Sequence, residues 1–418
     1  MSTGPRSATS GKSPGYYARR RFLRNYPAVA GLIWLVLCVL VAIFAYPLMP
    51  DDTENANFQV VELPKRPPGT SATLLLQPIF LEQAEPGGLS YLISGRPDRS
   101  RPVVVNSRES VVLEDDRLRY VDLRGVTQTE LLPVFLLDLD KYAPAARAWQ
   151  EEFGKPYRRE GDEVEYVDRT TGAATASLAE LKARFVEEHL VERTFVLGTD
   201  GFGRDVLSRL LLGTRVSMAV GLMAVIVSLL LGISLGAVAG FFRGRVDTVV
   251  MWFVSVVWSI PTLLLAISIS FALGEGLWQL FLAIGASTWV EVARIVRGQI
   301  FTVREMQYVE ATRAMGFGNF RTIVRHILPN VFGPLIIIAA ANFAAAILIE
   351  AGLSFLGVGI QAPAPSWGSM IKEGYTQVMF ESGAWLAIFP GIAIILVVIS
   401  LNLVGFGLRD ALDPKYEK

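Results

Sequence analysis

The run VSMAVGLMAVIVSLLLGISLGAVAGFF at residues 216–242 contains no charged side chain. The hydrocarbon core of a bilayer is about 30 Å thick, and roughly 20 apolar residues of helix cross it. The run is long enough to do so, and it therefore predicts a transmembrane helix from Val216 to Phe242.

Five more apolar runs lie on either side of it along the chain. The run ending at Val296 is the weakest, since Glu291 and Arg294 fall near its end. Pro261 and Pro390 do not argue against helices, because membrane helices tolerate proline better than soluble ones. We predict an all-α polytopic membrane protein with about six transmembrane helices, in preference to a large soluble protein with buried helices. The five runs are Pro27–Leu48, Thr248–Gly274, Gly276–Val296, Leu328–Ile349 and Trp385–Leu408.

The composition of the 418 residues limits the alternatives. Charged residues make up 19%, less than soluble proteins usually carry, and a formal net charge of zero gives no case for nucleic acid. Cys38 alone cannot form an internal disulfide. The two histidines, His189 and His326, are far apart, which argues against a multi-histidine metal site and leaves a carboxylate site open. We expect no cofactor in this chain.

A basic cluster precedes the first run, as it does in a signal peptide. It consists of Arg19, Arg20, Arg21 and Arg24. The charge-free stretch Tyr26–Pro50 exceeds a typical signal core, and no small-residue cleavage pattern follows it. We interpret the run as a retained helix, with cleavage as the alternative.

Lys and Arg in short loops orient a membrane protein, because cytoplasmic loops carry an excess of them. Arg243 and Arg245 follow the second run, and six arginines lie between the fourth and fifth. The loop between the third and fourth runs has no Lys or Arg, and only Lys372 lies between the fifth and sixth. We therefore expect both termini and the arginine-rich segment in the cytoplasm. The six arginines are Arg294, Arg297, Arg304, Arg313, Arg321 and Arg325.

Residues 49–196 then lie outside, as an inserted α+β domain. Its alternative is a partly disordered loop, which the apolar strands argue against. Pro144 suits the first turn of one helix, and Ser177 with Glu180 fits a capping box for another. Its paired acids lack a calcium-loop spacing and are expected on a solvated surface. The expected strands are 73–76, 91–94, 102–105, 111–113 and 164–167, the helices 145–153 and 178–190, and the acids Asp115, Asp116, Asp138 and Asp140.

A short segment between the fourth and fifth runs reads EMQYVEATRAMG at residues 305–316. Gln307–Met315 suits a short helix that stops at Gly316, and Asn319 suits the cap of a second. In that second helix an apolar face is expected from Ile323, Val324, Ile327 and Leu328. Two short helices joined by glycines make a compact knob that can transmit rigid-body motion, and an ordinary amphipathic loop is the alternative.

Nucleotide chemistry is not expected in this chain. Residues 201–205 read GFGRD, which lacks the full glycine spacing of a dinucleotide loop and leads into a membrane helix. No Walker A sequence occurs, so ATP binding by that route is excluded.

Glu310-Ala311-Thr312, Gly316 and Leu328-Pro329 resemble the EAA signature of ABC importer permeases. Thr312 stands in place of the usual second alanine, and His326 where an isoleucine is often found. The order of further motifs resembles the dipeptide, oligopeptide and nickel class, from which the long insertion departs. These motifs are residues 197–209, 326–330, 350–357, 365–368 and 407–414, and the first includes Gly198, Asp200, Gly203, Arg204 and Asp205.

The resemblance implies the ABC importer permease fold and a subunit that is not itself an enzyme. It implies a heterodimer with a second homologous permease, two ABC ATPase subunits that bind ATP and Mg, and an extracytoplasmic substrate-binding protein. It also implies a bacterial inner membrane and, by class, a peptide cargo. The ATPase-coupling residues would be Glu310, Ala311, Thr312, Ala314, Gly316, Leu328 and Pro329.

The resulting organisation is a cytoplasmic tail at 1–26, a first transmembrane helix at 27–48, the insertion at 49–196 and a permease core at 197–418. The core contains helices two to six and the coupling segment 297–327. Glu350 and Glu291 are possible intramembrane polar groups, which would be functional by default. We prefer placements at helix ends, with Glu350 facing water and Glu291 beside Arg294. Other function classes left open are a secondary transporter and a membrane-anchored ligand sensor.

Overall fold

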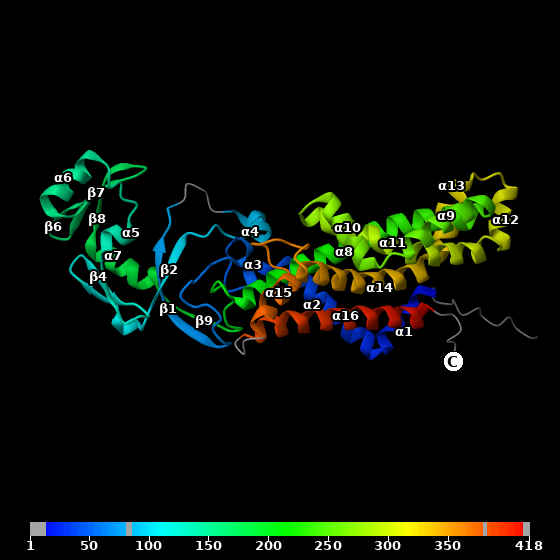
Figure 1. Ribbon diagram of the computed structural model, residues 1–418, viewed down its shortest axis with the longest axis horizontal. Helices are drawn as coiled ribbons and strands as arrows, with labels where there is room; N and C mark the ends of the chain where they lie inside the picture. Colours follow the sequence, from blue (N-terminus) through cyan, green and yellow to red (C-terminus); the bar gives the residue numbers. More distant parts are fainter. Residues whose placement is uncertain (1–13, 81–85, 379–382, 413–418) are drawn as a thin grey trace, which may run out of the picture. The chain divides into compact units, whose positions relative to one another are not determined.

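The computed structural model describes residues 14–80, 86–378 and 383–412 (Figure 1). Its residues divide into two compact units. The helical unit comprises Met1–Ala45, Leu210–Thr376 and Ala387–Lys418, and the α+β unit comprises Tyr46–Arg209 and Gln377–Leu386. Residues 1–13 of the tail and residues 413–414 of the C-terminal motif lie outside the described residues.

The helical unit consists of long apolar helices and the short helices that connect them. The helix α8 begins in the last residues assigned to the α+β unit, and most of its length belongs to the helical unit. The elements are α1 (Pro14–Arg24), α2 (Tyr26–Ile43), α8 (Val206–Phe242), α9 (Gly244–Trp258), α10 (Thr262–Leu273), α11 (Leu277–Val303), α12 (Gln307–Ala314), α13 (Asn319–Arg321), a π-helical turn (Thr322–Ile327), α14 (Leu328–Phe355), α15 (Trp367–Val378) and α16 (Trp385–Leu412).

Five helical stretches are long and apolar enough to cross a membrane, one of them formed by α13, the π-helical turn and α14 together. The bent pair α9 and α10 makes a sixth if it counts as one span. The five are Tyr26–Ile43, Val206–Phe242, Leu277–Val303, Asn319–Phe355 and Trp385–Leu412. The prediction of about six transmembrane helices is therefore confirmed.

The third predicted helix, Thr248–Gly274, is wrong as a single element. It is broken between Trp258 and Thr262, where the chain bends by 91°. Pro261 has no N–H to donate and disfavours a helical conformation in the residue before it, so the helix ends and restarts here. The first predicted helix is also interrupted, because α2 ends at Ile43 and a separate turn, α3 (Ala45–Leu48), follows.

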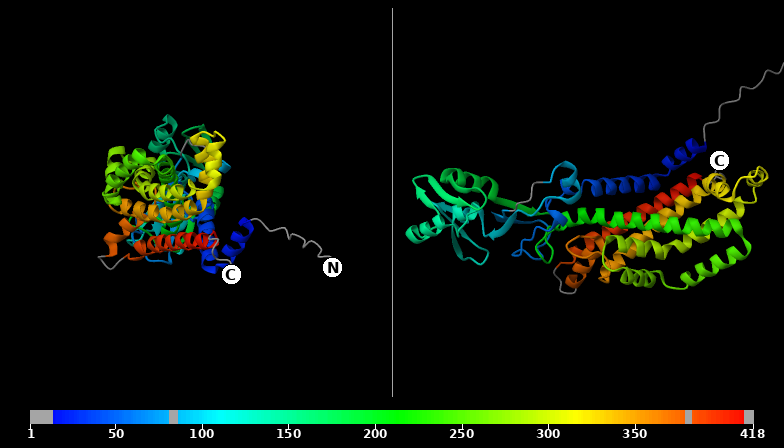
Figure 2. Two further views of the ribbon diagram at one scale, coloured as in Figure 1. Left: turned by 90° about the vertical axis from the view of Figure 1, so that its right-hand side faces the viewer. Right: turned by 90° about the horizontal axis from the view of Figure 1, so that it is seen from above.

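Small residues bring α8 against its neighbours, and the three helices α8, α11 and α14 run alongside one another (Figures 1 and 2). A Cβ on Gly232 would lie 2.4 Å from the Cβ of Val292, and one on Gly236 would lie 2.5 Å from the carbonyl oxygen of Ala293. Neither position accepts a side chain without separating the helices. Close backbone approach of this kind is typical of helix packing in membranes.

The α+β unit contains three antiparallel sheets of three strands among its described residues, in the orders β2-β1-β9, β3-β4-β5 and β6-β7-β8. The strands are β1 (Thr70–Pro78), β2 (Ser100–Val105), β3 (Val112–Glu114), β4 (Arg117–Val121), β5 (Thr127–Leu131), β6 (Arg158–Glu160), β7 (Glu163–Asp168), β8 (Gly172–Ser177) and β9 (Leu190–Phe195). The helices are α3, α4 (Gly88–Ser94), α5 (Leu132–Leu136), α6 (Pro144–Phe153) and α7 (Leu178–Arg184), with 3-10 turns at Glu54–Ala56 and Arg108–Ser110.

Two apolar clusters hold this unit together. The larger packs α5 and α7 against the sheets and includes Phe135 and Phe185, whose rings meet edge to face at 5.8 Å. The smaller includes Phe58, Leu74 and Phe195. A domain with its own buried core is a folded unit, so the alternative of a disordered loop is wrong.

Most of the predicted strands are confirmed, and one strand prediction in this unit is wrong. Residues 91–94 form the end of α4 and not a strand. The helix predicted over 178–190 is confirmed to within one residue, because α7 passes at Arg184 directly into a π-helical turn, Phe185–His189, and β9 begins at Leu190. Short apolar runs fit either a strand or one face of a helix, which explains the error at residues 91–94.

Candidate functional site

The coupling segment between α11 and α14 is anchored by its buried side. Val309 of α12 is fully buried, in a cluster with Phe241 of α8, Val303 of α11 and Val331 of α14. Thr312 is also buried, and its hydroxyl donates to the carbonyl oxygen of Val309 at 2.6 Å. The short helix therefore packs against the ends of three long helices.

Gly316 ends α12 as the sequence predicts. Its φ of +77° lies in the left-handed region, where glycine is favoured. The N–H of Phe317 donates to the carbonyl oxygen of Thr312 at 3.0 Å, and that of Gly316 to Arg313 at 2.9 Å. These two bonds form a Schellman motif, which fixes the direction in which the chain leaves the helix.

The second short helix differs from the prediction. Asn319 is its first residue, and the N-cap is Gly318. Val324 is exposed while Ile323 and Ile327 are buried, because the chain there is π-helical and the apolar face shifts.

The remaining residues of the predicted coupling set are mostly exposed to solvent. Glu310, Ala311, Ala314 and Gly316 are exposed, and so is Pro329, whereas Leu328 is half-buried. Of the seven predicted residues, Thr312 is thus the one that faces inward. The exposed set gives α12 a narrow outer face with one carboxylate.

Arginine pairs brace the base of the coupling segment. Arg297 binds Asp247 of α9 with two bonds of 2.5 and 2.6 Å, and Arg243 binds Glu305 at 2.6 Å. The two guanidinium groups also lie 4.5 and 4.6 Å from the ring centre of Phe301. These contacts join α9 to the end of α11, and sequence reasoning missed Asp247.

Arg304 and Arg313 both lie over the ring of Phe241, at 5.6 and 5.1 Å from its centre. Burial, followed by repulsion from Arg313 and Arg243, lowers the pKa of Arg304. Two like charges, one at the start of the coupling helix region and one on α12, therefore both contact the aromatic ring at the end of α8.

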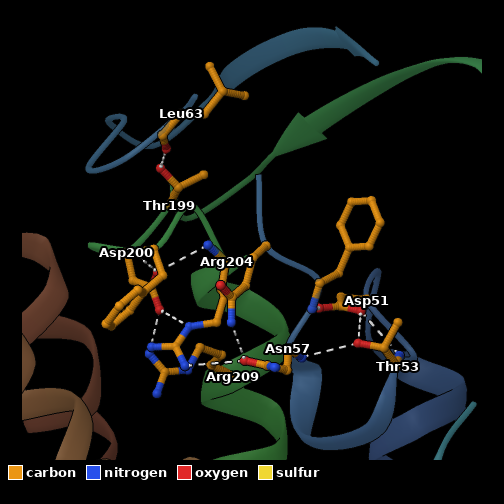
Figure 3. A network of polar contacts seen from close by, with 11 residues as sticks. Asp51, Thr53, Asn57, Leu63, Thr199, Asp200, Arg204 and Arg209 are labelled. Atoms are coloured by element: carbon orange, nitrogen blue, oxygen red, sulfur yellow. Dashed lines mark hydrogen bonds and ion pairs between the residues drawn. The ribbon is translucent and has the colours of Figure 1, made fainter. Parts of the chain in front are cut away.

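The motif residues 198–205 form a tight turn before α8 (Figure 3). Asp200 is buried and accepts bonds from the backbone of Phe202 and Arg204 at 2.8 and 3.0 Å. The same carboxylate lies 2.7 Å from Arg204 Nε and 2.5 Å from Arg209 Nη1, and both arginines are buried. A Cβ at Gly203 would lie 1.9 Å from the carbonyl oxygen of Val60, so only glycine fits there.

The turn is bonded to the start of the α+β unit. Asp205 caps α8 by accepting from the backbone N–H and the hydroxyl of Ser208, and Ser208 Oγ accepts from the N–H of Asp51 at 2.9 Å. Thr199 donates to the carbonyl oxygen of Leu63 at 2.5 Å (Figure 3). It also accepts from the N–H of Arg66 at 2.8 Å. These bonds close the two ends of the insertion on each other.

Asp51 is the buried carboxylate on the other side of this network. It accepts from the N–H and hydroxyl of Thr53 and from the N–H of Phe58, at 2.7 to 3.1 Å. Burial raises the pKa of Asp51 despite these bonds and the nearby charge of Arg193. Arg209 lies within the predicted motif 197–209, whereas Asp51 was not foreseen as its partner because the two are distant in sequence.

Glu350 lies inside the helical unit and not at a water-facing helix end. Its helix, α14, continues to Phe355, and the carboxylate is fully buried. Ser217 of α8 donates to it at 3.1 Å and Ser354 at 2.8 Å. Ser217 in turn accepts from the N–H of Trp367 at 3.2 Å, so the site joins α8, α14 and α15.

Glu291 also departs from the prediction. It is exposed on α11, and among the described residues no ion pair joins it to Arg294. The guanidinium of Arg294 instead lies 4.1 Å from the ring centre of Trp258. A cation over an aromatic face is stabilised without a carboxylate partner.

One of the predicted surface acids of the α+β unit is buried. Asp116 accepts from the hydroxyl of Tyr157 at 2.6 Å and pairs with Lys155. Burial alone would raise the pKa of Asp116, but the bonds from Lys155 and Tyr157 outweigh it and the pKa lies below its ordinary value. The same arrangement raises the pKa of Tyr157, first by burial and then through Asp116. Asp115 is exposed as expected and pairs with Arg159.

Comparison with known proteins matches both ends of the chain to families. Residues 232–418 match the model of binding-protein-dependent transport system inner membrane components, and residues 13–68 match the N-terminal transmembrane domain of oligopeptide transport permease C. The glutathione transport system permease protein GsiD of Pectobacterium atrosepticum is 38% identical over 219 residues, 52% of this chain and 72% of that protein. The dipeptide transport system permease protein DppC of Bacillus subtilis is 41% identical over 222 residues, 53% of this chain and 69% of that protein.

The chain belongs to the family of binding-protein-dependent transport system inner membrane components. This confirms the resemblance read from the motifs and favours a permease over a secondary transporter or a sensor. A solved structure of the MetNI methionine ABC transporter, in inward-facing conformations, covers 50% of this chain and 97% of its own at 18% identity. Its TM-score of 0.42 is too low to add to the assignment.

The two family models cover the candidate sites of this transport component unequally. The coupling segment and Glu350 lie within 232–418, and Asp51 lies within 13–68. The motif turn and most of the α+β unit fall between the two matched ranges. The functions of those residues must therefore be argued from their own geometry.

Proposed function

We propose that this chain is one permease half of an ATP-driven importer, coupled to its ATPases through α12. The observation that carries the proposal is the two-sided character of α12. Val309 and Thr312 fix its inner side, while Glu310, Ala311 and Ala314 leave an exposed outer side. The partners in this proposal are a second homologous permease, two ABC ATPase subunits and an extracytoplasmic substrate-binding protein.

Coupling follows from packing in this proposal. An ATPase cleft that closes on the outer side of α12 pushes a helix that cannot move alone, because Val309 is packed among α8, α11 and α14. Packed helices shift as units, so the displacement passes to the long helices. The small side chains of Ala311 and Ala314 permit close approach, and Glu310 offers a charge to an arginine or a helix end.

Peptides are the proposed cargo. The support is the naming of several relatives as dipeptide or oligopeptide transport permeases. ATP and Mg would bind the partner subunits, and the purified chain alone is expected not to retain a fluorescent ATP analogue. The proposed location is a bacterial inner membrane, with the termini and α12 in the cytoplasm and the α+β unit outside.

Two substitutions test the coupling role. Glu310→Lys reverses the exposed charge, and Gly316→Leu places a side chain at a left-handed φ of +77°. We expect both to abolish peptide uptake by the reconstituted complex and to reduce copurification of the ATPase, while the chain stays in the membrane. Glu151→Lys, an equivalent reversal on exposed α6, serves as the control. Normal uptake in both α12 variants would remove the coupling assignment.

A further inference from the structure

A groove of about 710 Å³ lies within the α+β unit. It is bordered by the start of β1, the end of β2 with the loop after it, and the segment before β1. This volume is in the range of small-ligand sites. Its lining includes Arg66, Thr70–Thr73, Val104–Glu109, Leu123 and Glu192.

One wall of the groove is an open strand edge. β9 pairs with β1 over Thr70–Leu75, but β2 pairs with it only from Thr73 to Pro78. β2 ends at Val105, and the next residue, Asn106, donates its N–H to Val121 instead. Within the described residues, Thr70–Ala72 therefore have a strand partner on one side only. Apart from the Thr70 N–H, which donates to the carbonyl oxygen of Pro67 at 3.3 Å, this side of Thr70–Ala72 has no backbone partner among the described residues, and such an edge is a template for an added strand.

The groove also carries charges of both signs. Its lining includes two arginines and two glutamates, and all four are exposed: Arg66, Arg108, Glu109 and Glu192. Among the described residues none of the four belongs to an ion pair. Guanidinium groups bind carboxylates, and carboxylates bind ammonium groups. A free peptide has a carboxylate at one end and an ammonium group at the other.

We propose that this groove, the β1-edge groove, binds a short peptide in an extended conformation as a strand added along Thr70–Ala72. Three residues of strand extend about 10 Å, which sets the length of the ligand near a tripeptide. An arginine of the groove binds its carboxylate end, and a glutamate binds its ammonium end. The proposal rests on the proposed peptide cargo and adds a site for it outside the helical unit.

Binding of trialanine to the full chain in lipid nanodiscs, measured by calorimetry, tests the groove. We expect saturable binding that falls at least about tenfold in Arg66→Ala/Arg108→Ala and in Glu109→Ala/Glu192→Ala, because hydrogen bonds to charged groups carry that much affinity. The control pair Arg101→Ala/Glu151→Ala removes exposed charges away from the groove and should bind normally. Trialanine methylated at its central nitrogen should also bind more weakly, since it lacks a strand donor.

Two results would overturn the proposal. One is the absence of saturable trialanine binding, and the other is unchanged binding in the two groove variants. The uptake assay separates this failure from failure of the proposed function. If uptake is coupled normally but the chain in nanodiscs does not bind trialanine, the groove proposal fails and the importer proposal stands. If the chain binds trialanine in the groove but does not couple to an ATPase, the importer proposal fails and the groove proposal stands.

Discussion

Asp200 supplies a buried negative charge to the motif turn. Its carboxylate faces the guanidinium groups of Arg204 and Arg209, and all three are nearly excluded from solvent. Asp200→Asn keeps the shape and removes the negative charge that faces these two buried cations. Removing one partner of a buried pair typically costs about 3–5 kcal/mol. We expect lower thermal stability and faster hydrogen exchange over residues 57–66.

A matched substitution shows whether burial is the cause. Asp115→Asn removes another arginine partner in the same unit, but Asp115 is exposed. Exposed pairs contribute about 0–1 kcal/mol, so its unfolding should stay close to that of the unmodified chain. Equal effects of the two substitutions would contradict this account of Asp200.

Asp116 gives the α+β unit a defined response to acid. Its pKa in the folded chain lies below the ordinary 3.8, because bonds from Lys155 and Tyr157 outweigh burial. A carboxyl with a depressed folded pKa stabilises fully above the ordinary value and loses that contribution as the pH falls through the folded value. We expect Asp116→Asn to flatten the decline of thermal stability below about pH 4. A decline as steep as in the unmodified chain would exclude Asp116 as its source.

At the scale of elements, Glu350 links three helices through hydroxyl groups. Glu350→Ala leaves the hydroxyls of Ser217 and Ser354 buried without their acceptor, at about 1–3 kcal/mol for each group. Glu350→Gln keeps one acceptor oxygen in place. We therefore expect the alanine variant to unfold at a clearly lower temperature in detergent than the glutamine variant. Glu291→Ala, on an exposed face, is the control.

The elements also show what the sequence could and could not predict. Long apolar runs predicted the spans, because apolar length is set by the bilayer. The break at Pro261 was missed, since proline within a membrane helix gives a kink in some cases and a break in others. Residues 91–94 were misassigned because four residues are too few to tell the two-residue repeat of a strand from the 3.6-residue repeat of a helix. Asp51 and Asp200 carry no shared signal, since their network forms only when distant segments meet.

At the scale of the whole molecule, the basic loops predict a single orientation, with α12 in the cytoplasm and the α+β unit outside. Cys38 is buried and can be removed as Cys38→Ala, which leaves a chain for single-cysteine labelling. Glu151→Cys on α6 and Glu310→Cys on α12 then mark the two units at exposed positions. We expect a membrane-impermeant maleimide, added to spheroplasts, to label position 151 and to reach position 310 only after lysis. Labelling of position 310 from outside would place α12 beyond the reach of any cytoplasmic ATPase. The coupling role would then fail even though the packing beneath α12 stands.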